Sequence, residues 1–228
     1  MCIFKKRAIT FGDYNTADHG WTLTGWKLSA PEQKTSYVEK SGGDGSWDLS
    51  TVMTDGIPKY KDRTLTVTLE CSKGTRADRE EKINHMVNLL DGLEWEIVLP
   101  DRPDHFLTGR LHVAVDYSDL AHAAVTVTGL CKPWLYYRRE TVVELQHSIS
   151  YLSTHTLRNT GRLAVVPTLI VESDTEGIEL SFGEQYAYVG LVTGTYSWPD
   201  LHLTPGDHEL RFLGKGKVTI VYREAVLR

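Results

Sequence analysis

Cysteine and long apolar segments are scarce in this chain of 228 residues. The three cysteines, Cys2, Cys71 and Cys131, are odd in number and form no CxxC pair. A disulfide framework and a thiolate zinc site are therefore not expected, and Cys71 and Cys131 are interpreted as small buried hydrophobic residues. No apolar run approaches the roughly 18 residues that span a bilayer, and the N-terminal segment lacks a signal-peptide core. We expect a soluble protein made in a cytoplasm.

Blocks of like charge are also missing. The formal net charge is -5, and acidic and basic residues alternate along the chain. A protein that binds nucleic acid or an anionic membrane surface needs a basic patch, and the sequence offers none. We expect neither sequence recognition of nucleic acid nor membrane insertion.

No motif identifies a catalytic group. The sequence has no GxSxG, SxxK, HExxH or GxxxxGK[ST]. The histidines show no metal-ligand spacing, and His202 and His208, on either side of the LTPGD turn, offer only a weak two-ligand alternative. The GKGK of residues 214–217 is interpreted as a hairpin turn rather than a phosphate loop. We expect no metal, no cofactor and no enzymatic activity.

Ionisable residues are most crowded in LPDRPDHFLTGRL, residues 99–111. Asp101 or Asp104 could pair with His105 as a tuned base, which would make the chain a hydrolase. Neighbouring residues of an extended chain point to opposite sides, however. The two prolines and two aspartates are typical of a tight connection between strands. We interpret the segment as a turn, and the hydrolase is the weakest alternative.

Alternation of apolar and polar residues dominates the first half of the chain. It predicts half-buried antiparallel strands in RTLTVTLEC, LEWEIVL, RLHVAVDY and AVTVTGLC. In WTLTGWKLS the apolar phase shifts across Gly25, and a glycine at such a shift predicts a β-bulge. The first half is therefore expected to be a β-sandwich-like domain.

One segment, residues 75–91, has helical spacing instead. Its apolar stripe consists of Ile83, Met86, Val87 and Leu90. Thr75 is expected to cap its start, with Asp78 at the capping-box position, and Gly92 to close its end. The sequence predicts one α-helix in a mainly β protein.

The pattern changes near residue 140. The segment TVVELQHSISYLSTHTLRNTG is weakly patterned, and short predicted strands then follow one another, separated by turn signals at residues 173–177 and 214–216 among others. Short strands with no helix predict a β-sandwich of jelly-roll type. We expect two domains, residues 1–139 and 140–228.

Two aromatic segments are candidate binding surfaces. The glycine-rich loop at residues 41–46 precedes Trp47, which suits a segment ordered by a neighbouring subunit, although a solvated hairpin tip explains it equally well. A second group could stack sugars or belong to the core: Tyr186, Tyr188, Tyr196 and Trp198. A carbohydrate-binding module that recognises host surface glycans through the C-terminal β-sandwich is therefore the alternative function.

Four segments follow one another in a recognisable order. They are GDGSWDLSTVMTDGIPKYKDRTLTVTLE, LLDGLEWEIVLPDRPDHFLTGRLHVAV, VTVTGLCKPWLYY and the second half from NTGRLAVVPTLIVES onward. In this order they resemble the distal tail protein (Dit) family of long-tailed phages, the siphophages. That family often has Pro-Tyr where this chain has Pro133–Trp134.

The resemblance implies that the chain is a structural component of the tail tip or baseplate of a phage or prophage. Residues 1–139 would form a homo-hexameric hub ring between the tail-tube protein and the tail-associated hub protein. Residues 140–228 would be a galectin-like β-sandwich that projects outward and could dock a receptor-binding protein. Candidate subunit-interface residues are Gly42, Gly43, Trp47 and Tyr60. The protein would belong to the virion, be assembled in the bacterial host cytoplasm and serve host adsorption.

Overall fold

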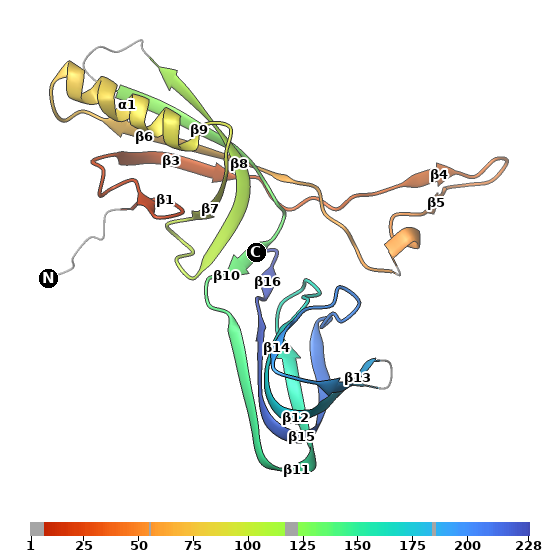
Figure 1. The fold of residues 1–228 in the computed structure, drawn as a ribbon. Helices are drawn as coiled ribbons and strands as arrows, with labels where there is room; N and C mark the ends of the chain where they lie inside the picture. Colours follow the sequence, from red (N-terminus) through yellow and green to blue (C-terminus); the bar gives the residue numbers. More distant parts are fainter. Residues whose placement is uncertain (1–6, 55, 117–122, 184–185) are drawn as a thin grey trace, which may run out of the picture. The chain divides into compact units, whose positions relative to one another are not determined.

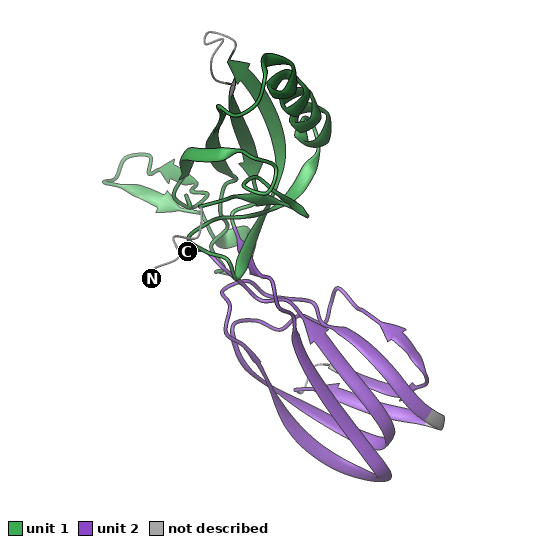
Figure 2. Ribbon diagram, turned by 90° about the vertical axis from the view of Figure 1, so that its left-hand side faces the viewer, with its two compact units in different colours: residues 1–133, 228 green, residues 134–227 purple. Residues whose placement is uncertain are grey.

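The computed structural model describes residues 7–54, 56–116, 123–183 and 186–228, except for the side chains of residues 123, 174–176 and 186. The chain is mainly β with one α-helix, as predicted. It forms two compact units, residues 1–133 with Arg228 and residues 134–227 (Figure 2). The predicted domain boundary at residues 139/140 lies a few residues after the division between these units.

The first unit is built on one antiparallel sheet with the order β2-β1-β7-β8-β9-β6-β3 (Figure 1). Its strands are β1 (Thr10–Phe11), β2 (Tyr14–Asn15), β3 (Thr22–Leu28), β6 (Arg63–Cys71), β7 (Glu94–Val98), β8 (His105–Asp116) and β9 (Ala123–Cys131). The predicted alternation is confirmed, because Leu65, Val67 and Leu69 are fully buried while the intervening threonines lie on the opposite face.

The predicted helix is α1 (Arg76–Leu90), which lies against β8 and β9 (Figure 1). Thr75 and Asp78 form a reciprocal capping box. The Asp78 N–H donates to the Thr75 hydroxyl at 3.2 Å, and the Thr75 N–H donates to the Asp78 carboxylate at 2.7 Å. The helix buries Ile83, Met86 and Leu90, and Gly92 follows its C-cap with a φ of 75°. The helix and both its ends are confirmed.

Two further local predictions are confirmed in the first unit. The register of β3 with β6 shifts between Leu23 and Gly25, which is the predicted bulge. The segment from Leu99 to His105 is a turn, since the Arg102 N–H donates to the Leu99 carbonyl and the His105 N–H to the Arg102 carbonyl, both at 3.1 Å. The next strand begins at His105, five residues before the start of the RLHVAVDY pattern at Arg110.

Between β3 and β6 the chain leaves the sheet as a long two-stranded arm, residues 30–62 (Figure 1). The arm contains β4 (Tyr37–Glu39) and β5 (Ser46–Asp48), which pair antiparallel, followed by a 3-10 helix, η1 (Val52–Thr54). An isolated bridge joins Gln33 to Tyr60 nearer its base. None of its described residues is buried, so the arm contributes nothing to the core.

The second unit is one antiparallel sheet folded over on itself. Its long strands are β11 (Thr141–Asn159), β15 (Gly206–Tyr222) and β12 (Thr168–Phe182), neighbours in that order. The short β13 (Tyr186–Leu191) and β14 (Gly194–Tyr196) both pair with β12, and β10 (Leu135–Tyr137) pairs with β16 (Ala225–Val226).

The pairings of β15 with β11 and with β12 both shift register at the same place. The shifts lie between His147 and Tyr151 of β11 and between Ser173 and Ile178 of β12, both opposite residues 214–216 of β15. Both halves of β11 contribute to a single core, through Leu145 before the register shift and Leu157 after it. Figures 1 and 2 show the long strands β11, β12 and β15 curving over at one end of the unit, so that a single sheet forms two layers.

Three predictions about this unit are wrong in detail. The GKGK segment is not a hairpin turn but lies inside β15, where Gly214 and Gly216 have φ angles of 132° and 142°. A side chain at Gly216 would lie 2.5 Å from the Glu172 carbonyl oxygen, so a glycine is needed for the close approach of two backbones. The predicted turn at residues 173–177 likewise lies inside a strand, β12. The weakly patterned segment after residue 140 is the 19-residue strand β11.

Candidate functional site

Exposed apolar side chains gather on the arm. Val38 lies opposite Trp47 across the β4–β5 pair, and these side chains are 49% and 60% exposed. The Lys40 ammonium lies 4.8 Å from the centroid of the Trp47 ring. The large hydrophobic residues that the arm exposes are Tyr37, Val38, Trp47, Leu49, Val52, Met53 and Ile57. An exposed apolar cluster of this extent on a protruding segment is typical of a surface that another molecule covers.

Alternation along the two strands gives the arm two different faces. Val38 and Trp47 share the apolar face, on which the strand alternation also places Leu49. Glu39 and Asp48 lie on the opposite face. The Ser50 side chain and the Ser50 N–H, 2.9 Å from the carboxylate, lower the pKa of Asp48, so this face is acidic at neutral pH.

Three of the four predicted interface residues come together on the outer part of the arm. Gly42 and Gly43 form the turn between β4 and β5, where Gly42 has a φ of 76°, and Trp47 follows in β5. Tyr60 instead lies in the bridge to Gln33, away from the tip. Their role as subunit contacts stays a prediction. Sequence reasoning missed Met53, which is 93% exposed, because apolarity alone does not reveal exposure.

The predicted aromatic platform is largely an internal stack. Trp198 stacks on Tyr188 at a centroid distance of 4.1 Å and on Tyr196 at 5.3 Å. All three rings are half-buried and pack against the core of the second unit. The side chain of Tyr186 lies outside the described residues. Because the rings cover one another, each offers less of its face to a sugar, and glycan binding stays a prediction.

The Asp101, Asp104 and His105 cluster lies in the β7–β8 turn. The Asp101 carboxylate is 3.9 Å from Arg102 Nε. Burial, and then the nearby Arg102, lower the pKa of His105, while Asp104 opposes this shift. Burial and Arg102 therefore dominate the environment of this imidazole, and neither neighbouring carboxylate governs its pKa.

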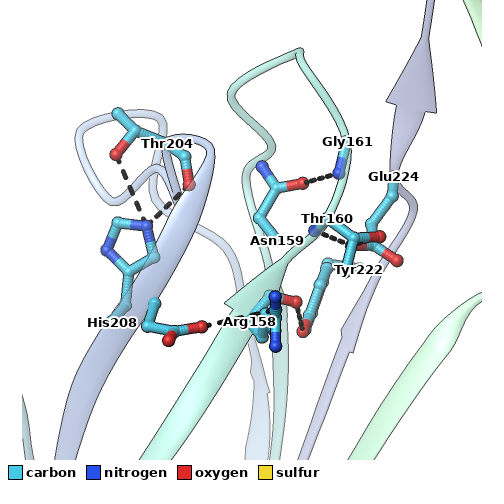
Figure 3. Close-up of polar contacts among 9 residues, drawn as sticks. Arg158, Asn159, Thr160, Gly161, Thr204, His208, Tyr222 and Glu224 are labelled. Atoms are coloured by element: carbon cyan, nitrogen blue, oxygen red, sulfur yellow. Dashed lines mark hydrogen bonds and ion pairs between the residues drawn. The ribbon is translucent and has the colours of Figure 1, made fainter.

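Of the two histidines on either side of the LTPGD turn, His208 is hydrogen-bonded within the fold. His208 Nε2 lies 2.7 Å from the Thr204 carbonyl oxygen, and a carbonyl only accepts, so this nitrogen carries a proton (Figure 3). Among the described residues no group of three or more His, Cys, Asp or Glu side chains could hold a metal ion. Within the same part of the chain, no helix has the length and apolarity to cross a membrane.

A network of polar contacts lies at one end of β11 (Figure 3). The buried Asn159 amide donates to the Leu203 carbonyl at 2.8 Å, and its oxygen accepts from the Gly161 N–H at 2.9 Å. The Glu224 carboxylate accepts from the N–H and the hydroxyl of Thr160. These hydrogen bonds link residues distant in sequence and fix the chain path at this end of the unit.

The described cysteines behave as predicted. Cys71 and Cys131 are free and buried. Burial raises the pKa of Cys131 to about 12, which keeps its thiol protonated and unreactive. Cys2 lies outside the described residues.

No protein-family model and no curated protein matches this sequence. Among solved structures, the SPP1 Dit protein (gp 19.1), described as a paradigm of the hub adsorption apparatus in Gram-positive infecting phages, superposes with a TM-score of 0.67. The match covers 96% of this chain and 98% of that chain at 17% identity. The chain has the Dit fold. The resemblance drawn from the order of sequence motifs is therefore confirmed as a likeness of fold over nearly the whole length.

Proposed function

We propose that this chain is a structural protein of a phage or prophage tail, the distal tail protein of the hub. Copies would form a hexameric ring that joins the tail tube to the tail-tip adsorption apparatus. The observation that carries the proposal is the exposed apolar arm, in a fold that matches a phage hub protein from end to end.

The arm makes self-association favourable. Its large apolar side chains remain between 42% and 93% exposed, because no described residue of the arm is buried. Covering Trp47, Val38 and Leu49 with a second protein surface would release water from apolar area, which is the main driving force of stable association. A closed ring needs such a protruding surface on one side of each copy and a receiving surface on the other.

The remaining roles follow from the two units. The first unit would build the ring, stacking on the tail-tube protein on one side and on the tail-associated hub protein on the other. The second unit, the predicted galectin-like domain, would project from the ring and could dock a receptor-binding protein. Neither role calls for catalysis, and the protein would be part of the virion.

Light scattering coupled to size-exclusion chromatography, with negative-stain electron microscopy, tests the proposal. We expect six-fold rings for the wild type and a shift toward monomer for Trp47→Asp. Val189→Asp is the matched control, because Val189 is 71% exposed in the second unit and lies outside the proposed ring contact. A wild-type chain that stays monomeric at every concentration, with and without tail-tube protein, would contradict the proposal, as would a Trp47→Asp variant that assembles normally.

A further inference from the structure

We infer that the open edge of β11 in the second unit pairs with the same edge of a second copy. The two strands run antiparallel across a two-fold axis, so that the folded sheets of both copies merge. This contact, called here the β11 edge contact, is made by the strand Thr141–Asn159. It uses no residue of the arm and goes beyond the proposed ring function without resting on it.

One edge of the second sheet is protected and the other is open. The protected edge is divided between two short strands, β13 of six residues and β14 of three. The open edge is β11, which has 19 residues and pairs with β15 alone among the described strands (Figure 1). Proteins commonly block an edge with lysine, proline or short strands, because its unpaired backbone groups recruit another strand. The sequence of β11 contains neither lysine nor proline.

The middle of this edge is uncharged and partly apolar. Residues 145–157 contain no Asp, Glu, Lys or Arg. Around the register shift the strand exposes Ile149, Tyr151 and Leu152, at 68%, 49% and 61%. A strand added at this edge therefore gains backbone hydrogen bonds and covers apolar side chains at the same time.

The charges near the two ends of β11 select a second copy as the partner. Apart from histidines, its charged residues are Glu144 and Arg158, one on either side of the register shift. Antiparallel pairing aligned at the shift places the Glu144 half of each strand beside the Arg158 half of the other. Parallel pairing would instead place like charges side by side, which is unfavourable.

Both charged side chains are accessible to a partner. Those of Glu144 and Arg158 are 61% and 73% exposed. Each already has an opposite charge beside it on β15, since Glu144 Oε2 lies 3.2 Å from Lys217 Nζ and Arg158 Nε lies 3.6 Å from Asp207 Oδ1. The contact therefore joins these four residue types from β15 and β11 of both copies into one network of alternating charge. Such a network contributes more than an isolated exposed ion pair.

Strand alternation lets the merged sheet keep both cores on one side. Leu145 and His147 before the shift and Leu157 after it are buried, and all occupy odd positions. Antiparallel registers that set odd residues opposite odd residues continue the core face of one copy into that of the other. The bends of both copies then meet near residues 148–150, on the two-fold axis. A two-fold contact closes on itself, so it joins two free copies or copies from two different rings.

A single cysteine near the axis tests the contact. In a Cys2→Ser background, Ser150→Cys should give covalent dimers on non-reducing gels after mild oxidation, because a residue near a two-fold axis meets its own copy. The two Cα atoms must approach within roughly 7 Å for this to occur. Val189→Cys on the protected edge is the matched control, since Val189 is 71% exposed and should give no dimer. Equal yields of dimer from the two variants would overturn the contact.

Charge reversal provides a second measurement that does not depend on disulfide geometry. Glu144→Arg and Arg158→Glu should each weaken dimerisation roughly tenfold at low salt, because each sets like charges together at two symmetric places. The double variant restores complementarity and should dimerise within roughly twofold of the unreversed protein. Sedimentation in a Trp47→Asp background, which removes the proposed ring contact, measures the monomer–dimer dissociation constant. A double variant as weak as the single variants also overturns the contact.

The ring function and the β11 edge contact can fail separately. Rings in the microscope, together with equal cross-linking of the two cysteine variants, overturn the edge contact and leave the ring function standing. A wild-type chain that forms no ring, together with Ser150→Cys dimers and rescue by the double charge variant, overturns the ring function and supports the edge contact.

Discussion

The hydroxyl of Ser153 lies 2.8 Å from Nε2 of His147 at the fold of the second sheet. His147 Nδ1 lies 3.3 Å from the Gly214 carbonyl oxygen, which can only accept, so Nδ1 carries the imidazole proton and Nε2 accepts from Ser153. The Ser153 oxygen in turn accepts from Nε2 of His155 at 2.7 Å. One backbone carbonyl, that of Gly214, thus determines the direction of the hydrogen bonds that link His147, Ser153 and His155.

Removing the central hydroxyl should destabilise the second unit. His147 is only 3% exposed, and Ser153→Ala leaves its Nε2 without this donor in a site that excludes water. A buried acceptor left without a partner costs about 1 to 3 kcal/mol. Urea unfolding at pH 7.5 measures this change, with the exposed neighbour Thr154→Ala as the control, expected to stay within about 0.5 kcal/mol of wild type. An equal loss of unfolding free energy in both variants would show that the Ser153–His147 hydrogen bond contributes little to stability.

Trp198 should contribute to stability more than to sugar binding. Because it stacks on Tyr188 and Tyr196 over the core, Trp198→Ala removes packing and two ring contacts, for a loss of roughly 1 to 3 kcal/mol. Thermal or urea unfolding checks the loss, and the exposed Val189→Ala should unfold like the wild type. A well-folded Trp198→Phe protein that has lost glycan-array binding seen with the wild type would instead support the carbohydrate-binding alternative.

Features that depend on residues close in sequence could be predicted. The helix α1, its Thr75–Asp78 capping box and the bulge at Gly25 each follow from side chains within a few positions of one another. The β7–β8 turn follows from its prolines and aspartates in the same way. The loop at Gly42 beside Trp47 could also be predicted, because a glycine-rich segment next to a tryptophan is a local signal.

Features set by distant strands could not be predicted. Gly214 and Gly216 look like a hairpin turn in sequence, and only the matching shifts in β11 and β12 show that they bend a continuous strand. The bridge of Tyr60 to Gln33 likewise depends on how the two strands of the arm return. Pairing between strands far apart in the sequence depends on tertiary packing, which local sequence patterns do not reveal.

The capping box of α1 should make the first unit sensitive to acid. Hydrogen bonds from the Thr75 N–H and hydroxyl lower the pKa of Asp78 in the folded state. A lowered pKa means that this stability is present above the unfolded value near 4 and is lost as the pH falls through the folded value. Asp78→Asn should therefore unfold more easily than wild type at pH 7, and the difference should vanish at low pH. Urea titrations at both pH values measure it, and a difference of constant size would contradict the assignment.

Gly109 should tolerate no side chain, because β8 and β9 approach too closely there. A Cβ at Gly109 would lie 2.6 Å from Cys131 Sγ and 2.9 Å from the Leu130 carbonyl oxygen, so Gly109→Ala must push the strands apart. Overpacking of this kind costs about 1 to 3 kcal/mol. The control is Gly43→Ala at the arm tip, where the nearest atom is 3.9 Å away. Labelling of the Cys131 thiol, followed by mass spectrometry in increasing urea, reports the opening of this strand pair. Gly109→Ala should label at lower urea than wild type and Gly43→Ala at the same urea, whereas unchanged labelling of Gly109→Ala would mean that the pair relaxes without cost.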